Sequence, residues 1–438
     1  MKKRLRNGFI LLFASVFIGL ILLFLIFCLP VNSVKKNVEA SLYNMVDVRY
    51  DDDGSQFRKN LLEQKEYFTD YLMAQNAMEK VEGKSPLAHA IYIYHYDLGN
   101  DTTWLTEESL VTSVKQGTEG MYLKEYSKYW HGYLVWLKPL LMIMSWDAVE
   151  IFLVVVQVLL LLAVVAISFY KKKPYVGIMV LVALAFMKPV RIWISFSMCV
   201  SFTITLIAVL LELLYYDKLE KKNWRDEFFI LIGIMTAYMD FLTYPIVTLG
   251  IPLCTYVVMK AQEELHWFAR IRQIFWMGAC WVAGYIGMWG MKWVVAELFY
   301  QTGTLRNAVW SVIYRTSPLD GRQSFFSGAP RTWNLVMQQY DSPLYTVLFV
   351  AIVAVAVISS VWCMIKARNK NWGISLFALC VIATAPIVWL ILTQNHTAIH
   401  CGFTFRIMGA SVFALCSITA CSLLTLRNKG NYEAKKDN

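Results

Sequence analysis

The sequence predicts an all-α membrane protein with about ten transmembrane helices and a helical extracytoplasmic segment after the first helix. Of its 438 residues, 58% are hydrophobic and 16% are charged, whereas soluble domains have roughly 45–50% and roughly 25%. The mean hydropathy is +0.47, and a soluble core cannot bury this much apolar surface. The net charge of +10 comes from short basic clusters at the ends of apolar runs. Because these clusters do not form one basic stripe, no nucleic-acid partner is expected.

The first apolar run, residues 8–30, follows a basic N-terminus. It holds about 22 uninterrupted apolar residues, more than the roughly 7–15 of a signal-peptide core, and no small-residue cleavage site follows it. We therefore expect residues 1–30 to remain in the lipid bilayer as an N-terminal transmembrane anchor.

Further apolar runs are candidates for membrane-spanning helices, namely 147–169, 175–187, 194–216, 227–240, 245–260, 275–299, 344–366, 372–393 and 407–426. If the first helix leads outward, every segment assigned to the inside carries three or four lysines or arginines, and the short outside turns do not match that density. This distribution follows the positive-inside rule. It predicts a multi-pass protein of the cell membrane, a bacterial inner or plasma membrane, with the N-terminus and the C-terminus in the cytoplasm.

This topology divides the chain into a series of parts. They are the anchor 1–30, an extracytoplasmic subdomain 31–138, transmembrane helices 2–7 in 139–299, an extracytoplasmic loop 300–343, transmembrane helices 8–10 in 344–426 and a cytoplasmic tail 427–438. In the subdomain, Phe57, Leu61, Phe68 and Leu72 recur at helical spacing. We expect these residues to form the apolar face of a helix that lies on the membrane.

Two of the apolar runs are short. Residues 175–187 and 227–240 each offer about 13 apolar residues, which cover only about 20 Å of a hydrocarbon core roughly 30 Å thick. Polar groups at membrane depth are tolerated where they line a protein-enclosed or watery cavity. We therefore expect a cavity open to the outside, with Lys188, Arg191 and Asp240 in its wall.

The predicted outside turn 394–406 gathers polar side chains beside the membrane. His396 and His400 are four residues apart, which places them on one helix face with metal-ligand spacing. A divalent metal is possible there but not indicated, because the glutamate of an HExxH motif is missing. The other readings are a hydrogen-bonded interfacial turn from which Arg406 snorkels, and a site for an anionic head group that includes Asn395.

The run 126–139, YSKYWHGYLVWLKP, is rich in aromatic residues and contains Lys128, His131 and Lys138. Aromatic residues at this depth are typical of the belt at a membrane interface. The same rings can stack on sugars while their polar edges bind hydroxyl groups. The run is therefore either an interfacial belt or a carbohydrate platform.

Glycosyl transfer requires a carboxylate that takes the proton of the acceptor. The candidates on the predicted outer side are Asp51, Asp52, Asp53, Asp70, Asp97, Asp101, Asp240, Asp320 and Asp341. Asp52 lies in an acidic run that also suits a turn or helix cap. Asp70 falls on the polar face of the expected helix, where it is also explained as a solvated charge. Asp240 has the strongest physical claim, because a carboxylate at membrane depth is expensive, although it also suits a structural partner of Lys188, Arg191 or Lys292.

Basic residues also occur where the positive-inside rule does not predict them. Lys292 lies in the outer half of its span, where a lysine that reaches for the membrane surface is the default interpretation. The following outside loop carries further arginines, namely Arg306, Arg315, Arg322 and Arg331. Either they bind a lipid phosphate or an acidic glycan, or they pair with the acidic first outside segment.

Four segments, FTDYLM, SKYWHGYLVWLKPLL, YMDFLTYPIVTLGIPL and NHTAIHCGFTFR, together with the layout of the helices, resemble the GT-C type of membrane glycosyltransferases. The resemblance implies a sugar donor linked to polyprenyl phosphate and a glycan or protein acceptor outside the cytoplasm. It implies no cofactor, which agrees with the lack of Walker A, GxGxxG and GxSxG motifs.

The resemblance also implies roles for residues. The donor phosphate would be held by some of Lys188, Arg191, Lys292 and Arg406. Asp70, with Asp240 or Asp52 after it, would be the base, and His131, His396 and His400 would orient the leaving phosphate or the sugar. A transporter or flippase for a lipid-linked or anionic solute, and a polymerase or ligase of lipid-linked glycans, are the alternative functions.

Overall fold

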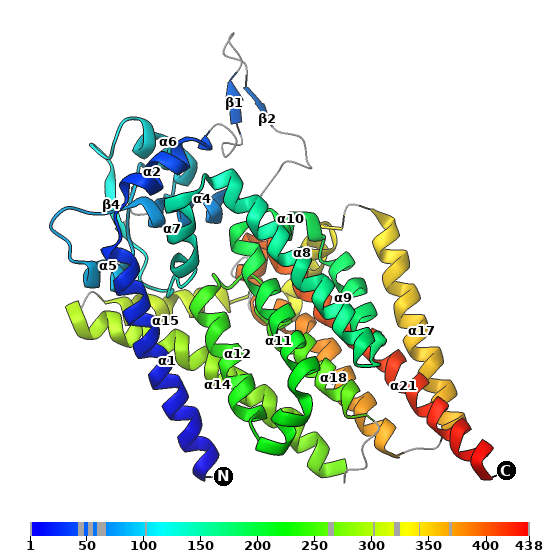
Figure 1. Ribbon diagram of the computed structural model, residues 1–438. Coiled ribbons are helices and arrows are strands. Elements are labelled where there is room, and N and C mark those ends of the chain that lie inside the picture. Colours follow the sequence, from blue (N-terminus) through cyan, green and yellow to red (C-terminus); the bar gives the residue numbers. More distant parts are fainter. Residues whose placement is uncertain are drawn as a thin grey trace.

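The computed structural model describes residues 2–42, 48–50, 56–58, 67–100, 103–261, 267–300, 303–318, 325–340, 342–367 and 370–436. Long helices run side by side in a bundle, and shorter elements form a separate group at one end of it (Figure 1). Both chain termini lie at the opposite end of the bundle. We call the group of elements between α1 and α8 the cap, and the two ends of the bundle the cap end and the termini end.

Within the described residues, seven helices are long and apolar enough to cross a membrane. They are α1 (Lys2–Cys28), α8 (Trp146–Tyr170), α11 (Phe196–Lys222), α14 (Trp267–Tyr300), α17 (Pro343–Ala367), α18 (Lys370–Leu392) and α21 (Met408–Lys436). Each coincides with an apolar run of the sequence, and many of their apolar side chains remain exposed on the bundle surface. The prediction of a mainly helical, multi-pass membrane protein is confirmed in this form.

Three shorter helices correspond to the remaining predicted spans, namely α9 (Pro174–Phe186), α12 (Arg225–Met239) and α13 (Ile246–Met259). They have 13 to 15 residues, so they extend only about 20–23 Å. This confirms that the short runs form short helices. The count of ten membrane-spanning helices stays a prediction.

Helices α12 and α14 pack very closely. A Cβ atom on Gly284 would lie 2.2 Å from the carbonyl oxygen of Ile230, and one on Gly233 would lie 2.2 Å from that of Trp281. Only glycine fits at such backbone contacts, which are typical of helix pairs in membranes. The close contact fixes α12, and thereby the turn that follows it at the cap end.

The cap contains strands as well as helices. Its helices are α2 (Asn32–Glu39), α4 (Tyr67–Met78), α5 (Pro86–Tyr92), α6 (Thr106–Lys115) and α7 (Leu134–Ile143). Its strands form two antiparallel pairs, β1 (Val48–Tyr50) with β2 (Gln56–Arg58) and β3 (Tyr94–Asp97) with β4 (Tyr122–Glu125). The segment predicted to be helical therefore contains strands as well, and its place outside the membrane stays a prediction.

Of the helix expected around Phe57 and Leu72, the described residues contain α4, Tyr67–Met78. Phe57 instead pairs with Arg49 across the β1–β2 hairpin, and Leu61 lies outside the described residues. The apolar residues at helical spacing thus belong to two different elements, the strand β2 and the helix α4. The periodicity was accidental because backbone pairing, not an amphipathic face, determines the conformation of residues 56–58.

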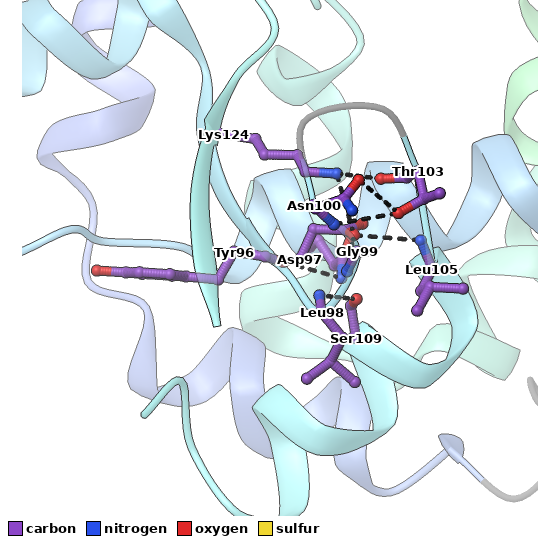
Figure 2. Close-up of polar contacts among 10 residues, drawn as sticks. Tyr96, Asp97, Leu98, Gly99, Asn100, Thr103, Leu105, Ser109 and Lys124 are labelled. Atoms are coloured by element: carbon purple, nitrogen blue, oxygen red, sulfur yellow. Dashed lines mark hydrogen bonds and ion pairs between the residues drawn. The ribbon is translucent and has the colours of Figure 1, made fainter. Parts of the chain in front are cut away.

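A buried carboxylate organises the loop between β3 and α6. Asp97 Oδ1 accepts hydrogen bonds from Gly99 N at 2.7 Å and Leu105 N at 3.1 Å, and it pairs with Lys124 Nζ at 3.2 Å (Figure 2). The Lys124 ammonium also donates to the Thr103 carbonyl oxygen at 2.5 Å. Asp97 thus ties the loop to β4 and serves the cap structurally.

Helix α14 is joined to the cap by side chains of both. Trp289 and Trp293 both donate to the Lys128 carbonyl oxygen, at 2.9 and 3.0 Å, and Trp130 donates to Met288 O at 2.6 Å. Lys292 is fully buried, and its ammonium donates to Ala90 O at 3.0 Å. The reading of Lys292 as a lysine reaching for the membrane surface is therefore wrong, because the cap covers it.

Short helices complete the cap end of the bundle, namely α10 (Pro189–Trp193), α15 (Thr304–Arg315), α16 (Phe325–Met337), α19 (Gln394–Ile399), α20 (Cys401–Thr404) and the 3-10 turn η2 (Phe405–Ile407). Helix α15 contacts both α14 and α19. These elements bring the second long loop and the histidine-rich turn next to each other.

We expect Glu212→Met to raise the melting temperature of the protein in detergent. Glu212 lies in α11, is 2% exposed, and neither of its carboxyl oxygens has a hydrogen-bond partner in the described part of the chain. An unsatisfied buried group of this kind costs about 1–3 kcal/mol. Thermal unfolding followed by tryptophan fluorescence measures the change. Glu119→Met, at an exposed position, is the control, and a lower melting temperature for Glu212→Met would contradict the expectation.

Candidate functional site

The turn after α12, residues 240–245, is the meeting point of the polar clusters found in the sequence. The Phe241 ring lies 5.0 Å from the rings of His131 and Tyr133, between centroids, and 6.2 Å from the Tyr126 ring, on which it stacks. On the other side, the Leu242 carbonyl oxygen accepts a hydrogen bond from His396 Nε2 at 3.1 Å. The aromatic run and the histidine-rich turn thus contact the same short segment.

Asp240 holds this turn in shape. Its Oδ2 accepts from Thr243 N at 2.8 Å and its Oδ1 from Thr243 Oγ1 at 2.5 Å. The side chain is 5% exposed, and Leu242 adopts a left-handed φ of 64°. The carboxylate lies directly after the C-terminal end of α12, and its position at membrane depth stays a prediction. The expected outward-open cavity around it stays a prediction.

The pair His131-Gly132 makes the closest contact between the cap and α12. Gly132 N donates to Tyr238 O at 2.8 Å, and a Cβ on Gly132 would lie 2.4 Å from the Tyr238 ring. His131 has a φ of 58°, a conformation rare for residues other than glycine. The backbone geometry therefore requires glycine at position 132, and the left-handed conformation of His131 directs its imidazole toward the aromatic cluster.

His131 belongs to a chain of buried hydrogen bonds. Its Nε2 donates to Tyr126 O at 2.9 Å, since a carbonyl can only accept. Its Nδ1 then accepts from the Tyr133 hydroxyl at 3.1 Å, which in turn accepts from Asn76 Nδ2 at 3.0 Å. Burial and the nearby Lys292 ammonium hold the pKa of His131 well below its usual range. The imidazole is neutral and fixed in one orientation.

Arg315, at the end of α15, determines the state of His396. Its Nη1 donates to His396 Nδ1 at 3.2 Å, so Nε2 carries the proton and donates to Leu242 O. Burial and the Arg315 charge hold the pKa of His396 well below its usual range. His396 therefore acts as a neutral link between Arg315 and the turn after α12.

The predicted common face of His396 and His400 is confirmed. Their ring centroids lie 4.9 Å apart, and His400 stacks on Phe403 at 4.9 Å. Burial and the Arg315 charge lower the pKa of His400 to about 4. The neighbouring Asn395 donates to Tyr314 O at 3.0 Å and to Ser317 Oγ at 2.7 Å. Asn395 thus holds the end of α15, where Arg315 lies.

Lys128 and Arg315 bring two positive charges together. The Lys128 ammonium donates to Ser311 Oγ at 2.7 Å, and Ser311 lies one helical turn before Arg315, a spacing of about 5–6 Å. The pKa of Lys128 is lowered by burial and by the Arg315 charge. In the described part of the chain, neither residue forms an ion pair with a carboxylate. Two neighbouring cations without an acid between them are suited to bind an anion.

From the sequence, Arg315 belongs only to a basic loop, and Lys128 is not assigned to the site. The signal that pointed to them is positive charge on the side predicted to be outside, where it is uncommon. Lys128 and Arg315 are 187 positions apart, so no local pattern could pair them. The guanidinium of Arg315 also interacts with the Tyr129 and Tyr126 hydroxyls, which completes a wall of aromatic and cationic groups.

Lys188 and Arg406, two of the predicted phosphate ligands, both lie close to the Phe405 ring. The Lys188 ammonium is 6.0 Å and the Arg406 guanidinium carbon 4.6 Å from the centroid of the Phe405 ring. Arg406 is fully buried and donates to Gly402 O at 2.7 Å, so it does not snorkel. Arg191 lies nearby in α10 and is half-buried. Lys292 is not part of this group.

Asp70 binds the N-terminus of α11. Its Oδ1 accepts from Ser197 N at 2.9 Å and Ser195 Oγ at 3.2 Å, and its Oδ2 accepts from Phe196 N at 3.2 Å. The side chain is 3% exposed, so the reading as a solvated charge is wrong. A carboxylate at this position satisfies unpaired backbone N–H groups and the helix dipole. Asp52 lies outside the described residues.

Asp240 and Arg315 both lie close enough to the Tyr285 phenol, on α14, to act on it electrostatically. Asp70 and Asp240 likewise both act on the Cys199 thiol near the start of α11.

No protein-family model, curated protein or solved structure matches this chain. In the part of the chain that the structure describes, no group of three or more His, Cys, Asp or Glu side chains is arranged to hold a metal ion. The assignment of function therefore depends on the geometry of the site alone.

We expect the folded protein to lose stability as the pH falls from about 6.5 to about 4. Burial lowers the pKa values of His89, His95 and His400 to about 4, whereas unfolded histidines have a pKa of about 6.5. The unfolded chain thus binds protons first, and acid favours unfolding in this window. Melting temperatures measured across these pH values check this. His400→Gln should flatten the curve, and a melting temperature independent of pH would contradict it.

Proposed function

We propose that the protein is a membrane glycosyltransferase that moves a sugar from a polyprenyl-phosphate-linked donor to an acceptor outside the cytoplasm. The observation that carries this proposal is the pair Lys128 and Arg315. Two cations share a surface with tyrosines and neutral histidines at one end of a membrane helix bundle, without a carboxylate between them in the described residues. The two cations suit a phosphate group, and their position at the end of a membrane helix bundle suits a lipid attached to it.

The donor phosphate would lie between Lys128 and Arg315. The guanidinium presents paired N–H groups that match two phosphate oxygens, and the ammonium adds a point charge. As the bond between the anomeric carbon and the phosphate oxygen breaks, negative charge grows on that oxygen. Fixed cations stabilise this charge without reorganisation. Lys188, Arg191 and Arg406 remain candidates for a second phosphate or the acceptor, whereas the bond to Ala90 O assigns Lys292 a structural role.

Asp240 is the preferred base. The acceptor hydroxyl oxygen would form the new bond to the anomeric carbon while its proton passes to a carboxylate, and one base on the opposite face from the leaving phosphate gives inversion. Asp70 is engaged by the first turn of α11. Asp240 accepts hydrogen bonds within its own turn, from Thr243, and both it and Arg315 act electrostatically on the Tyr285 phenol, which supports placing it near a phosphate bound by Arg315.

The aromatic run 126–133 would form the sugar platform. Tyr129 stacks on Trp289 with centroids 5.9 Å apart, and Tyr126 is half-buried beside it. A partly exposed ring on a rigid aromatic base suits stacking on a sugar. The histidines of the site are neutral, so they would orient the sugar or the phosphate by hydrogen bonds and would not add positive charge.

The proposal includes the topology predicted from the sequence, with ten spans, both termini in the cytoplasm and the cap outside. The cap end then faces the compartment where lipid-linked sugars are consumed. The acceptor would be a cell-envelope glycan or a protein.

Asp240→Asn should abolish transfer while the protein stays folded. Asp70→Asn should lower the stability of the protein and leave the transfer activity of the folded protein intact. Loss of a general base reduces turnover about 10²–10⁴-fold, whereas loss of a helix cap lowers stability by about 0.5–2 kcal/mol. Transfer from a synthetic prenyl-phosphate sugar in proteoliposomes and the melting temperature are measured for both variants. Full transfer by Asp240→Asn would exclude it as the base, and full transfer by both variants would overturn the proposed reaction.

Arg315→Gln should raise the KM for the donor by about tenfold or more, because a hydrogen bond to a charged group contributes about 1.5–3 kcal/mol. Arg315→Lys keeps the charge but loses the paired donors, so it should recover only part of the affinity. Arg306→Gln, an exposed position on the same helix, is the matched control. An unchanged KM in Arg315→Gln would contradict this placement of the phosphate, and movement of the donor across the bilayer without transfer would favour a flippase.

A further inference from the structure

Two adjoining cavities lie at the termini end, away from the site described above. The first has a volume of about 460 Å³ and lies between α1, α12 and α14. Its walls are almost entirely apolar and include Leu5, Gly8, Leu12, Ile230, Ala283 and Gly287. Small residues on both long helices keep this space open.

The second cavity has a volume of about 790 Å³ and a charged lining, made by Arg4, Glu220, Arg225, Asp226, Lys260 and Arg272 among others. Arg4, Asp226 and Trp276 line both cavities. The two spaces therefore meet, and together they offer one apolar and one charged compartment.

The charged compartment has an excess of positive charge. Its two acids are engaged by three of its four bases: Arg4 pairs with Asp226 at 3.4 Å, and Glu220 is shared by Arg225 at 3.1 Å and Lys260 at 2.6 Å. The exposed Arg272 has no carboxylate partner in the described part of the chain. The side chains that line the cavity thus carry a net charge of +2, which an anion would balance.

Trp276 marks the boundary between the compartments. Its Nε1 donates to Asp226 Oδ2 at 2.9 Å, while its ring contributes to the wall of the apolar cavity. Tryptophan in this orientation is typical of the boundary between the hydrocarbon core and the head groups. The charged compartment is therefore at head-group depth, and the apolar one faces the hydrocarbon core.

We propose that the two cavities together bind one anionic phospholipid, with its phosphate near Arg4 and Arg272 and one acyl chain along Gly8 and Ala283. Basic pockets between membrane helices bind anionic head groups in this way. A free phosphate or a nucleotide would use the charged compartment but not the apolar one. The site lies at the end of the bundle opposite the cap, so this inference does not depend on the proposed function.

The test is native mass spectrometry and thermal unfolding of the full chain in detergent. It is titrated separately with dioleoyl phosphatidylglycerol, dioleoyl phosphatidylcholine and glycerol phosphate. Arg272→Gln removes a cation that forms no ion pair with any described residue, and its matched control is Lys171→Gln, which is exposed and outside the cavities. Ala283→Trp fills the apolar cavity, and its control is Leu298→Trp, on the exposed side of the same helix.

Phosphatidylglycerol should bind and raise the melting temperature, as expected for a ligand of the folded state. Phosphatidylcholine and glycerol phosphate should have little effect. Arg272→Gln should weaken phosphatidylglycerol binding about fivefold, the typical contribution of one basic residue near an anionic membrane. Ala283→Trp should weaken it at least as much, and the two controls should not change it.

Three results would overturn the proposal. Equal binding of phosphatidylcholine would show that charge plays no part. Equal stabilisation by glycerol phosphate, with no effect of Ala283→Trp, would identify a site for a soluble anion. Binding that is unchanged in both Arg272→Gln and Ala283→Trp would place the lipid elsewhere on the helix bundle.

Discussion

The hydrogen bond from Gly132 N to Tyr238 O holds the cap against the helix bundle. It requires a glycine, because a side chain would collide with the Tyr238 ring, and a left-handed residue, His131, before it. Through this contact the aromatic run lies on the turn after α12. That turn accepts a hydrogen bond from His396, and His396 in turn accepts one from Arg315. The geometry of the candidate site therefore depends on one close approach between two backbones.

The polar groups at the cap end follow the rule that buried donors and acceptors need partners. Asp70 satisfies the first turn of α11, and Asp240 the turn that begins at Phe241. The histidines stay neutral because burial and nearby cations disfavour their charged forms. The positive charge of the site is thereby concentrated on lysine and arginine, the side chains best suited to hold phosphate.

Both ends of the molecule place cationic side chains beside aromatic residues. At the cap end, Lys128 and Arg315 stand beside tyrosines and a buried aspartate. At the termini end, Arg4 and Arg272 stand beside a tryptophan and an apolar cavity. The two places differ in their carboxylates: Asp240 accepts hydrogen bonds from Thr243, whereas Asp226 is paired with Arg4.

The sequence by itself determined the membrane class and the positions of the long and short helices, because apolar run length is a local property that the bilayer enforces. It also placed His396 and His400 on one face, since four-residue spacing fixes that. Only the tertiary structure decided that Asp70 caps a helix 125 positions away and that Lys292 is covered by the cap. It also decided that Lys128 meets Arg315. These facts depend on contacts between distant segments, which no local periodicity records.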